Sequence, residues 1–424
     1  MTPDVLTAEL RQRRDRLMRF LRSPAADVPV AFALYLVVLF PVVDYLLRRI
    51  PLVRFGAPLW DQALLFFLIV VTLARREKGE AKFLPALVPL LAFSATSLVV
   101  DLNYPGAALE GLRVTLQFIP LFFAARHLVD STKTRVWLFR AVGISAALIA
   151  FLGLIQPLVG VETPAGWVDM SETIGIRIFS IVQSPNVLGG HMALAAAIML
   201  GLAWYENGRR EKIAWSAGAA VTGITLLLTF SRGAWLAFAG AILLITLILD
   251  RRVFVVLLII TLLAGVGVPQ VRTRLFSVFS PEYIQKSALD GRLGRWLRAY
   301  DQLRKRPLFG MGPGRYGGAV AARRFGISYV DNYYVKTAVE MGLLGLIAFL
   351  YWIWAPVRAA YARWRRLRGR RLWRLYAGVI CALAAVLLHN GVENIFEVPY
   401  MNAYFWFILG LLLPARDEEA GDLR

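Results

Sequence analysis

The feature that most constrains this chain is a repeated pattern of long apolar stretches, each close to the length that crosses a membrane. A bilayer core about 30 Å thick requires roughly 20 apolar helical residues. Such stretches recur along all 424 residues, and short charged or Gly/Pro-bearing segments separate them. With 58% hydrophobic residues and a mean hydropathy of +0.58, the chain has more apolar surface than a soluble core of this length buries. The excess must face lipid.

Backbone polar groups inside a bilayer need partners within their own segment, so the apolar stretches predict helices. We expect an all-α polytopic membrane protein without a soluble partner domain. Its twelve predicted spans, with boundaries soft by several residues, are 27–47, 59–75, 83–101, 112–126, 136–158, 186–206, 212–230, 233–250, 253–270, 333–355, 375–391 and 401–415. The predicted segments are a cytoplasmic N-terminal part (1–26), spans one to nine (27–270), an outer loop (271–332), spans ten to twelve (333–415) and a cytoplasmic tail (416–424).

The charge distribution supports this topology. The first 26 residues are polar and arginine-rich, so we predict no cleavable signal peptide. With the N-terminus in the cytoplasm, most basic loops lie on that side, including Arg209–Lys212 and the run from Arg358 to Arg374. Two longer loops, 159–185 and 271–332, lie on the outer side, and the second departs from this charge rule because it is strongly basic.

The formal net charge of +20 could suggest nucleic acid, but most basic residues sit beside apolar spans. Orientation and anionic headgroups explain charges in that position, so we predict membrane lipids and no nucleic acid as partners. The single cysteine, Cys381, lies inside a predicted helix. Neither a disulfide nor a thiolate metal site is therefore predicted.

The most informative signal is the polar residues at the outer ends of the predicted helices, because charge near a membrane interior is unfavourable unless it has a function. Arg177 is followed by Pro185 and Asn186 at the start of the sixth span. Ordinary helix capping also explains this segment. Arg232 lies in a Ser-Arg-Gly turn between two apolar spans, where it either extends to the membrane interface or binds an anion.

The outer loop contributes further arginines. Arg292 and Arg295 precede a Gly-Met-Gly-Pro-Gly-Arg segment that ends at Arg315. No strand precedes these glycines and the Lys-Ser/Thr ending of a nucleotide-binding loop is absent, so we interpret them as a tight turn. Guanidinium groups bind phosphate oxygens at two points and stay charged at any working pH. Several arginines on the outer face therefore predict a dianionic or pyrophosphate-bearing ligand.

The outer loop ends in Asp331-Asn332. Nine residues separate Asn332 from Gly342, and Gly345 follows within the tenth predicted span. The two glycines suit close helix packing. Asp331 stands at a helix start, where a carboxylate either caps the helix or is placed to act as a general base.

His389 stands at the outer end of an apolar span, and Glu393 follows four residues later. If the helix continues, Glu393 lies one turn on and could orient the imidazole for proton transfer near neutral pH. A hydrogen-bonded helix-end histidine is the structural alternative. His127 and His191 have no carboxylate close in sequence and are interpreted as structural.

In this order, the motifs over residues 170–415 resemble the O-antigen polymerase and O-antigen ligase superfamily of bacterial surface-polysaccharide assembly. The resemblance implies a GT-C-like, all-α fold of about twelve transmembrane helices, with a long periplasmic loop between helices nine and ten. It also implies an inverting glycosyltransferase of the bacterial inner membrane, with its active site facing the periplasm and with no metal or other cofactor.

The resemblance assigns roles to the polar residues. The donor would be an oligosaccharide linked to undecaprenyl pyrophosphate, with Arg232 and Arg292 stabilising the charge on the leaving pyrophosphate. The residues expected to bind pyrophosphate or glycan are Arg177, Asn186, Arg232, Arg292, Arg295, Arg315 and Asn332. The residues expected to take part in catalysis are Asp331 as general base, His389 in a secondary proton-handling part and Glu393 as its support.

The two branches of the superfamily differ in their acceptor. Ligases transfer glycan to lipid A-core, and their motif has histidine where this chain has Asp331. We therefore favour a polymerase that joins repeat units, with a chain-length regulator open as a further partner. The alternatives are a ligase with a substituted base, a protein O-oligosaccharyltransferase, and a transporter or flippase of lipid-linked sugar. A transporter would need charge deep in several helices, whereas the candidates here cluster at the outer ends.

Overall fold

The structure of the chain, a computed structural model, describes residues 3–75, 82–100, 103–163, 177–267, 272–273, 276, 279–289 and 291–415. Over these residues it is helical and contains no strand, which confirms the predicted all-α class for this part of the chain. The predicted tail 416–424 and parts of the predicted loops 159–185 and 271–332 lie outside the described residues.

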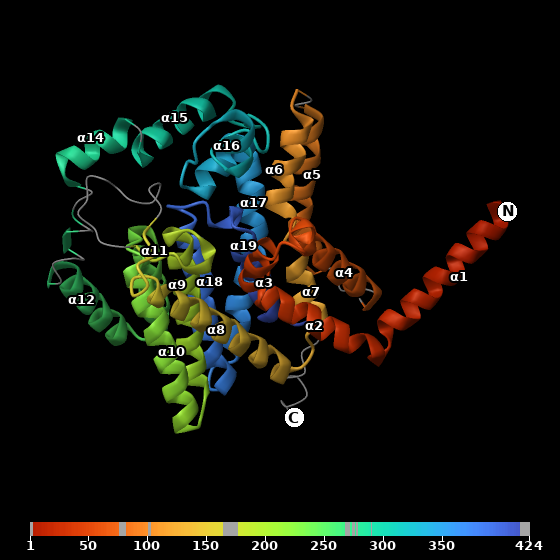
Figure 1. The fold of residues 1–424 in the computed structure, drawn as a ribbon, viewed down its shortest axis with the longest axis horizontal. Coiled ribbons are helices and arrows are strands. Elements are labelled where there is room, and N and C mark those ends of the chain that lie inside the picture. Colours follow the sequence, from red (N-terminus) through yellow and green to blue (C-terminus); the bar gives the residue numbers. More distant parts are fainter. Residues whose placement is uncertain are drawn as a thin grey trace.

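Long helices follow one another with short connections (Figure 1). The first half comprises α1 (Pro3–Arg22), η1 (Pro24–Ala26), α2 (Asp27–Val38), α3 (Phe40–Arg49), η2 (Arg54–Gly56), α4 (Trp60–Arg75), α5 (Leu84–Val100), α6 (Pro105–Leu116), α7 (Pro120–Leu128), α8 (Thr132–Ile155) and η4 (Ser180–Val182). The second half comprises α9 (Pro185–Tyr205), α10 (Arg209–Leu228), α11 (Arg232–Leu249), α12 (Arg251–Gly267), α14 (Pro281–Leu289), α15 (Arg292–Lys305), α16 (Ala319–Phe325), α17 (Tyr333–Arg366), α18 (Arg371–His389), η6 (Ile395–Glu397) and α19 (Pro399–Leu411).

Over the described residues, each of the twelve predicted spans coincides with helix, but two of them divide into separate helices and a third, at 333–355, is broken at Gly342 inside α17. The span predicted at 27–47 divides into α2 and α3 at Leu39, and the one predicted at 112–126 divides into α6 and α7. A proline in the first turn of α3 and of α7 explains both breaks, because proline lacks the N–H that a continuous helix needs. Among the described residues, six helices are long and apolar enough to cross a membrane, or seven if a bent pair at the N-terminus counts as one span. This is the composition of a polytopic membrane protein.

The packing is centred on α9, α18 and α19. Residues 400–411 of α19 are all buried. Helices α9 and α18 pack against each other at Gly201 and Gly378, where a Cβ on either residue would lie within 3 Å of the other helix's backbone. This contact is the close glycine packing known from membrane helices. It aligns the start of α9 with the end of α18.

Three helices of the predicted outer loop, α14, α15 and α16, lie together at one end of the molecule (Figure 1). Both Arg323 and Arg324 of α16 pair with Glu110 of α6, which ties the loop to the first half of the chain. Helix α15 packs against α17. The loop region is therefore folded onto the ends of the long helices.

Helix α17 is broken at Gly342, which has a φ of +69°. The segment after α15 fits into this break: the N–H of Leu343 donates to the carbonyl of Pro307 (2.8 Å), and the N–H of Met311 donates to that of Val339 (2.8 Å). A Cβ at Gly342 would overlap the carbonyl of Leu308. Loop packing thus explains Gly342, whereas the prediction of helix packing holds for Gly345, which faces Phe93 of α5.

Candidate active site

The candidate residues lie in the first turns of four helices. Asn186 is the second residue of α9, Arg232 the first of α11, Arg292 the first of α15, and Asn332 the N-cap of α17. Exposed N–H groups and the helix macrodipole make each such end favourable for an anion. The contacts of these residues bring the starts of the four helices close together.

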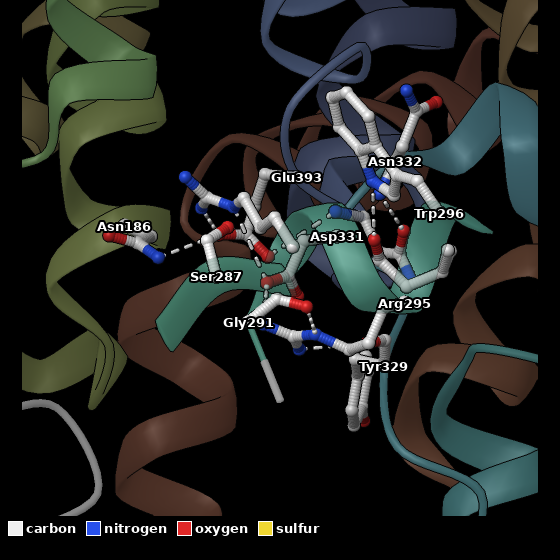
Figure 2. Close-up of polar contacts among 12 residues, drawn as sticks. Asn186, Ser287, Gly291, Arg295, Trp296, Tyr329, Asp331, Asn332 and Glu393 are labelled. Carbon is white, nitrogen blue, oxygen red and sulfur yellow. Dashed lines mark hydrogen bonds and ion pairs between the residues drawn. The ribbon is translucent and has the colours of Figure 1, made fainter. Parts of the chain in front are cut away.

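Asp331 joins the loop helices to α17. Its carboxylate lies 3.0 Å from a guanidinium nitrogen of Arg295 and 3.4 Å from one of Arg292 (Figure 2). Its φ of +51° lies in the left-handed region, which aspartate enters more readily than most residues other than glycine and asparagine. Asn332, rather than Asp331, caps the helix, because the Asn332 side chain accepts from the N–H groups of Tyr334 and Val335. The Asp331 carboxylate is therefore directed at arginines instead of the helix end.

Glu393 is the second carboxylate of the site. Its side chain accepts a 2.6 Å hydrogen bond from Asn186 and lies 3.7 Å from a guanidinium nitrogen of Arg292 (Figure 2). Burial raises the pKa of Glu393, and the nearby negative charge of Asp331 raises it further, while Arg292 opposes the shift. Arg292 thus lies between the carboxylate of Asp331 and the side chain of Glu393. The Glu393 carboxyl binds a proton more readily than an ordinary glutamate does.

Arg177 reaches the same place from the loop before α9. It donates to the side chain of Asn186 (3.0 Å) and to the carbonyl of Thr229 (3.0 Å). Burial lowers the pKa of Arg177 to about 10, and the positive charges of Arg232 and Arg292 act in the same direction. Three arginines are thus close enough to repel one another, and a bound anion would relieve that repulsion.

Arg232 faces the first loop helix. Its guanidinium lies over the ring of Tyr283 in α14, 4.8 Å from the centroid, and donates to the tyrosine hydroxyl (3.2 Å). Ser231 caps α11 and so fixes the first turn that carries Arg232. Arg315 lies elsewhere: it stacks on Tyr104, between α5 and α6. The structure does not place Arg315 among the contacts that join the four helix ends.

His389 and Glu393 are not arranged as the sequence suggested. Helix α18 ends at His389, so Glu393 is not one helical turn on, and its carboxylate bonds to Asn186 instead. His389 is buried, with 1% exposure, and neither ring nitrogen has a hydrogen-bond partner among the described residues. The imidazole occupies space left by Gly190 and Gly233, where a Cβ would contact the ring.

Hydrogen bonds from side chains to the backbone hold the segment around Asp331 in place. Trp296 of α15 donates to the carbonyl of Val330 (2.9 Å), just before Asp331. Asn394 accepts from the backbone N–H of Asn332 (3.1 Å) and donates to the carbonyl of Gly317 (2.7 Å). These bonds join the loop helices, the start of α17 and the segment after α18 into one unit.

Three buried charges were missed by the sequence reasoning. Lys336 lies 2.6 Å from Glu340 and 3.2 Å from Glu397, and all three side chains are at most 4% exposed. The backbone N–H of Tyr316 donates to Glu340, and that of Ala319 donates to Glu397. Two opposite charges four residues apart inside a predicted span were the signal that could have revealed them. The cluster fastens the loop segment before α16 to the first half of α17.

The arrangement combines an anion site with proton acceptors. Arginine side chains and helix N-termini converge where two carboxylates are held within reach of the same guanidinium. Such a site can bind phosphate groups, stabilise a phosphate leaving group and accept a proton from a nucleophile. Among the described residues, no group of three or more His, Cys, Asp or Glu side chains could hold a metal ion.

One comparison with known proteins bears on this site. A family model described as O-antigen ligase matches residues 217–350. This segment includes Arg232, Arg292, Arg295, Asp331 and Asn332, and it ends before His389 and Glu393. No curated protein matches the chain. The segment 217–350 is thus similar to the O-antigen ligase family, in agreement with the resemblance to O-antigen ligases and polymerases noted from the motifs.

Proposed function

We propose that the chain is a periplasmic-face, inverting glycosyltransferase of the bacterial inner membrane that polymerises glycan repeat units. Its donor would be an oligosaccharide linked to undecaprenyl pyrophosphate. The observation that carries the proposal is the meeting of Arg292 with Asp331 and Glu393, beside Arg177 and Arg232. A pyrophosphate-binding site and a proton acceptor within one site are what glycosyl transfer from a pyrophosphate needs.

In the proposed reaction, a hydroxyl oxygen of the acceptor sugar attacks the anomeric carbon of the donor. The bond between that carbon and the pyrophosphate oxygen breaks, and undecaprenyl pyrophosphate leaves with the bonding electrons. The hydroxyl proton passes to Asp331. Arg177, Arg232 and Arg292 bind the leaving pyrophosphate and stabilise its growing charge.

The ion pairs of the site suggest an order of events. Asp331 and Glu393 now occupy guanidinium nitrogens that the donor would bind. When phosphate oxygens take over Arg292, the Asp331 carboxylate keeps Arg295 as its nearest cation. Donor binding would thus release the Asp331 carboxylate from Arg292 before the acceptor reacts.

Position favours Asp331 as base over His389. Asp331 lies beside the arginines that would hold the donor, whereas His389 is buried among α9, α11 and α18 residues without a hydrogen-bond partner in the described structure. His389 keeps a secondary proposed part, since Arg292 is close enough to act on it electrostatically. Asp331 in place of the ligase histidine is also our reason to propose a polymerase before a ligase.

The transporter alternative receives little support from the buried charges. Lys336 and Glu340 lie inside α17, as charge in a transporter would, but they pair with each other and with Glu397. Their hydrogen bonds to the loop backbone match a role in holding the loop. The remaining candidates stand at helix ends.

The product formed by purified protein in liposomes tests the proposal. We expect lipid-linked repeat units alone to give a ladder of glycan lengths. Product that forms only after lipid A-core is added would identify a ligase instead. Movement of lipid-linked sugar across the bilayer without any new glycosidic bond would identify a transporter and refute the enzyme.

A further inference from the structure

A pocket of about 350 Å³ lies between α5 and the segment that follows α15. Its walls are largely apolar. The lining residues that matter here are Thr96, Arg306, Pro307, Leu308 and Phe309. None of them contributes to the ion pairs of the candidate active site.

The pocket wall is held in place by the broken helix. Pro307 and Leu308 bond through their carbonyls to N–H groups that the break at Gly342 leaves free in α17. Phe309 stacks on Phe93 of α5, with ring centroids 6.0 Å apart. The concave shape is therefore set by paired backbone and packed rings, as expected of a binding site that exists before its ligand arrives.

The pocket adjoins an apolar surface. Leu343 and Ile347 of α17 are 42% and 61% exposed, and Leu91 of α5 is 45% exposed. In a helix that crosses a membrane, such side chains face lipid. At the pocket itself, Arg306 is exposed, and its side chain makes no ion pair or hydrogen bond with any other described residue. An apolar cavity with a cation at its edge suits a hydrocarbon chain that ends in a phosphate.

The position of Arg306 distinguishes between the two substrates of the proposed polymerase. Arg292 begins the fourteen-residue helix α15 and Arg306 follows its end, so the two lie about 20 Å apart at 1.5 Å per residue. The donor reacts at the sugar joined to its pyrophosphate, which must therefore sit at Arg292. The acceptor reacts at the opposite end of its oligosaccharide. Its pyrophosphate must lie at a distance from the reacting atoms.

We propose that this pocket binds the lipid of the acceptor, with its isoprenoid chain against Leu308 and Phe309 and its pyrophosphate at Arg306. The assignment rests on the proposed polymerase function. Arg232, which would bind the donor pyrophosphate, begins α11 and contacts Tyr283 of α14. These helices and α5 lie on different sides of the molecule (Figure 1), so the two lipid tails would have separate entries. The repeat unit then spans α15 and presents its free hydroxyl to Asp331.

The test separates donor from acceptor. The donor is a repeat unit on undecaprenyl pyrophosphate whose accepting hydroxyl is blocked as a methyl ether. The acceptor cannot act as a donor because a methylene group replaces the oxygen between its anomeric carbon and the pyrophosphate, and it carries either an undecaprenyl chain or a methyl group in place of the lipid. Thr96→Trp fills the pocket from an exposed position of α5, and Leu91→Trp, outside the lining, is the matched control.

We expect Thr96→Trp to raise the KM for the undecaprenyl acceptor about tenfold or more, because excluding even about two methylene groups has that effect. The KM for the methyl acceptor, donor binding and kcat should stay near wild type, because a methyl group does not reach into the pocket. Arg306→Ala should raise the KM for both acceptors, whereas Lys305→Ala should not. An unchanged KM in Thr96→Trp, or a loss of donor binding instead, would overturn the assignment.

A second readout does not depend on turnover. An undecaprenyl acceptor with a photoreactive group on its chain should crosslink to the part of α5 that carries Thr96, and Thr96→Trp should abolish this crosslink. Crosslinking in a protein that forms no glycosidic bond would refute the proposed function and leave the lipid site standing. Turnover with crosslinks only to α11 or α12 would refute the lipid site alone.

Discussion

At the residue scale, the two carboxylates of the site compete with the proposed donor for the same guanidinium groups. Replacing Asp331 by Asn removes one competitor, so we expect donor binding to tighten roughly 2- to 10-fold. Turnover should fall by ~10²–10⁴-fold because the proton acceptor is lost. Donor Kd and single-turnover rates, measured separately, check both effects. Asp301→Asn, an exposed carboxylate on α15, is the control.

One outcome would assign the general base to His389 instead of Asp331. If Asp331→Asn turns over normally while His389→Ala binds donor and does not react, the base is His389. The buried position of that imidazole between α9 and α11 would then have to open during the reaction.

The raised pKa of Glu393 predicts a pH dependence of donor binding. Below that pKa, the carboxyl is neutral and does not compete for Arg292, so donor affinity should be highest on the acid side. As pH rises through the pKa, which lies above the ordinary value for glutamate, the carboxylate forms and affinity should fall. When donor Kd is measured against pH in the Glu393→Gln variant, we expect no such fall in affinity. The variant should keep, at every pH, the affinity that the wild type has at low pH. A fall of the same size in that variant would assign it to another group.

The arginines should differ from lysine in their effect on turnover. Arg232→Ala and Arg292→Ala should each lower kcat by about 10²-fold or more, because each removes a positive charge that stabilises the negative charge growing on the leaving pyrophosphate. Lysine at either position should restore only part of the rate, since it cannot bind at two points. Arg298→Ala, on the same helix as Arg292, is the control. Near wild-type turnover in one alanine variant would exclude that arginine from the mechanism.

At the element scale, the break in α17 aligns the helix start that carries Asp331 with the loop helices. Gly342→Ala should lower the free energy of unfolding by about 1–3 kcal/mol, because alanine is strained at a positive φ and its Cβ overlaps Leu308. Gly223→Ala in α10 has open space around it and should be neutral or slightly stabilising. Thermal unfolding in detergent measures both. Equal midpoints would show that the break is not a requirement of the fold.

At the scale of the whole molecule, the proposal places α14 to α16 on the periplasmic side and the α9–α10 turn in the cytoplasm. Cysteine at Arg323 in α16 should react with a membrane-impermeant thiol reagent in intact cells. Cysteine at Arg210 should react only after the membrane is opened. Cys381 is buried and should contribute little background. The reverse pattern would refute the topology and with it the periplasmic site.

The sequence alone determined the helices and the positions of most site residues within them. Apolar stretches of membrane length predicted the long helices of the membrane region, because length and hydropathy are local properties. They did not predict α1, which is long but polar and lies in the predicted cytoplasmic N-terminal part. Arginines and polar residues at the ends of these stretches marked the helix starts that meet in the site, as at Asn186, Arg232 and Asn332. The proline breaks were also local features of the sequence, at Pro41 and Pro120, although the predicted spans ran across both of them.

Only the tertiary structure decided which of these groups meet. Glu393 bonds to Asn186, 207 residues away, instead of to the nearby His389, because α18 ends at the histidine and turns the chain. Gly342 breaks α17 because a distant loop approaches its backbone. Lys336, Glu340 and Glu397 can remain buried because each finds an opposite charge or a backbone donor on another segment. Pairing of this kind depends on distances in space, which helical period and hydropathy along the chain do not contain.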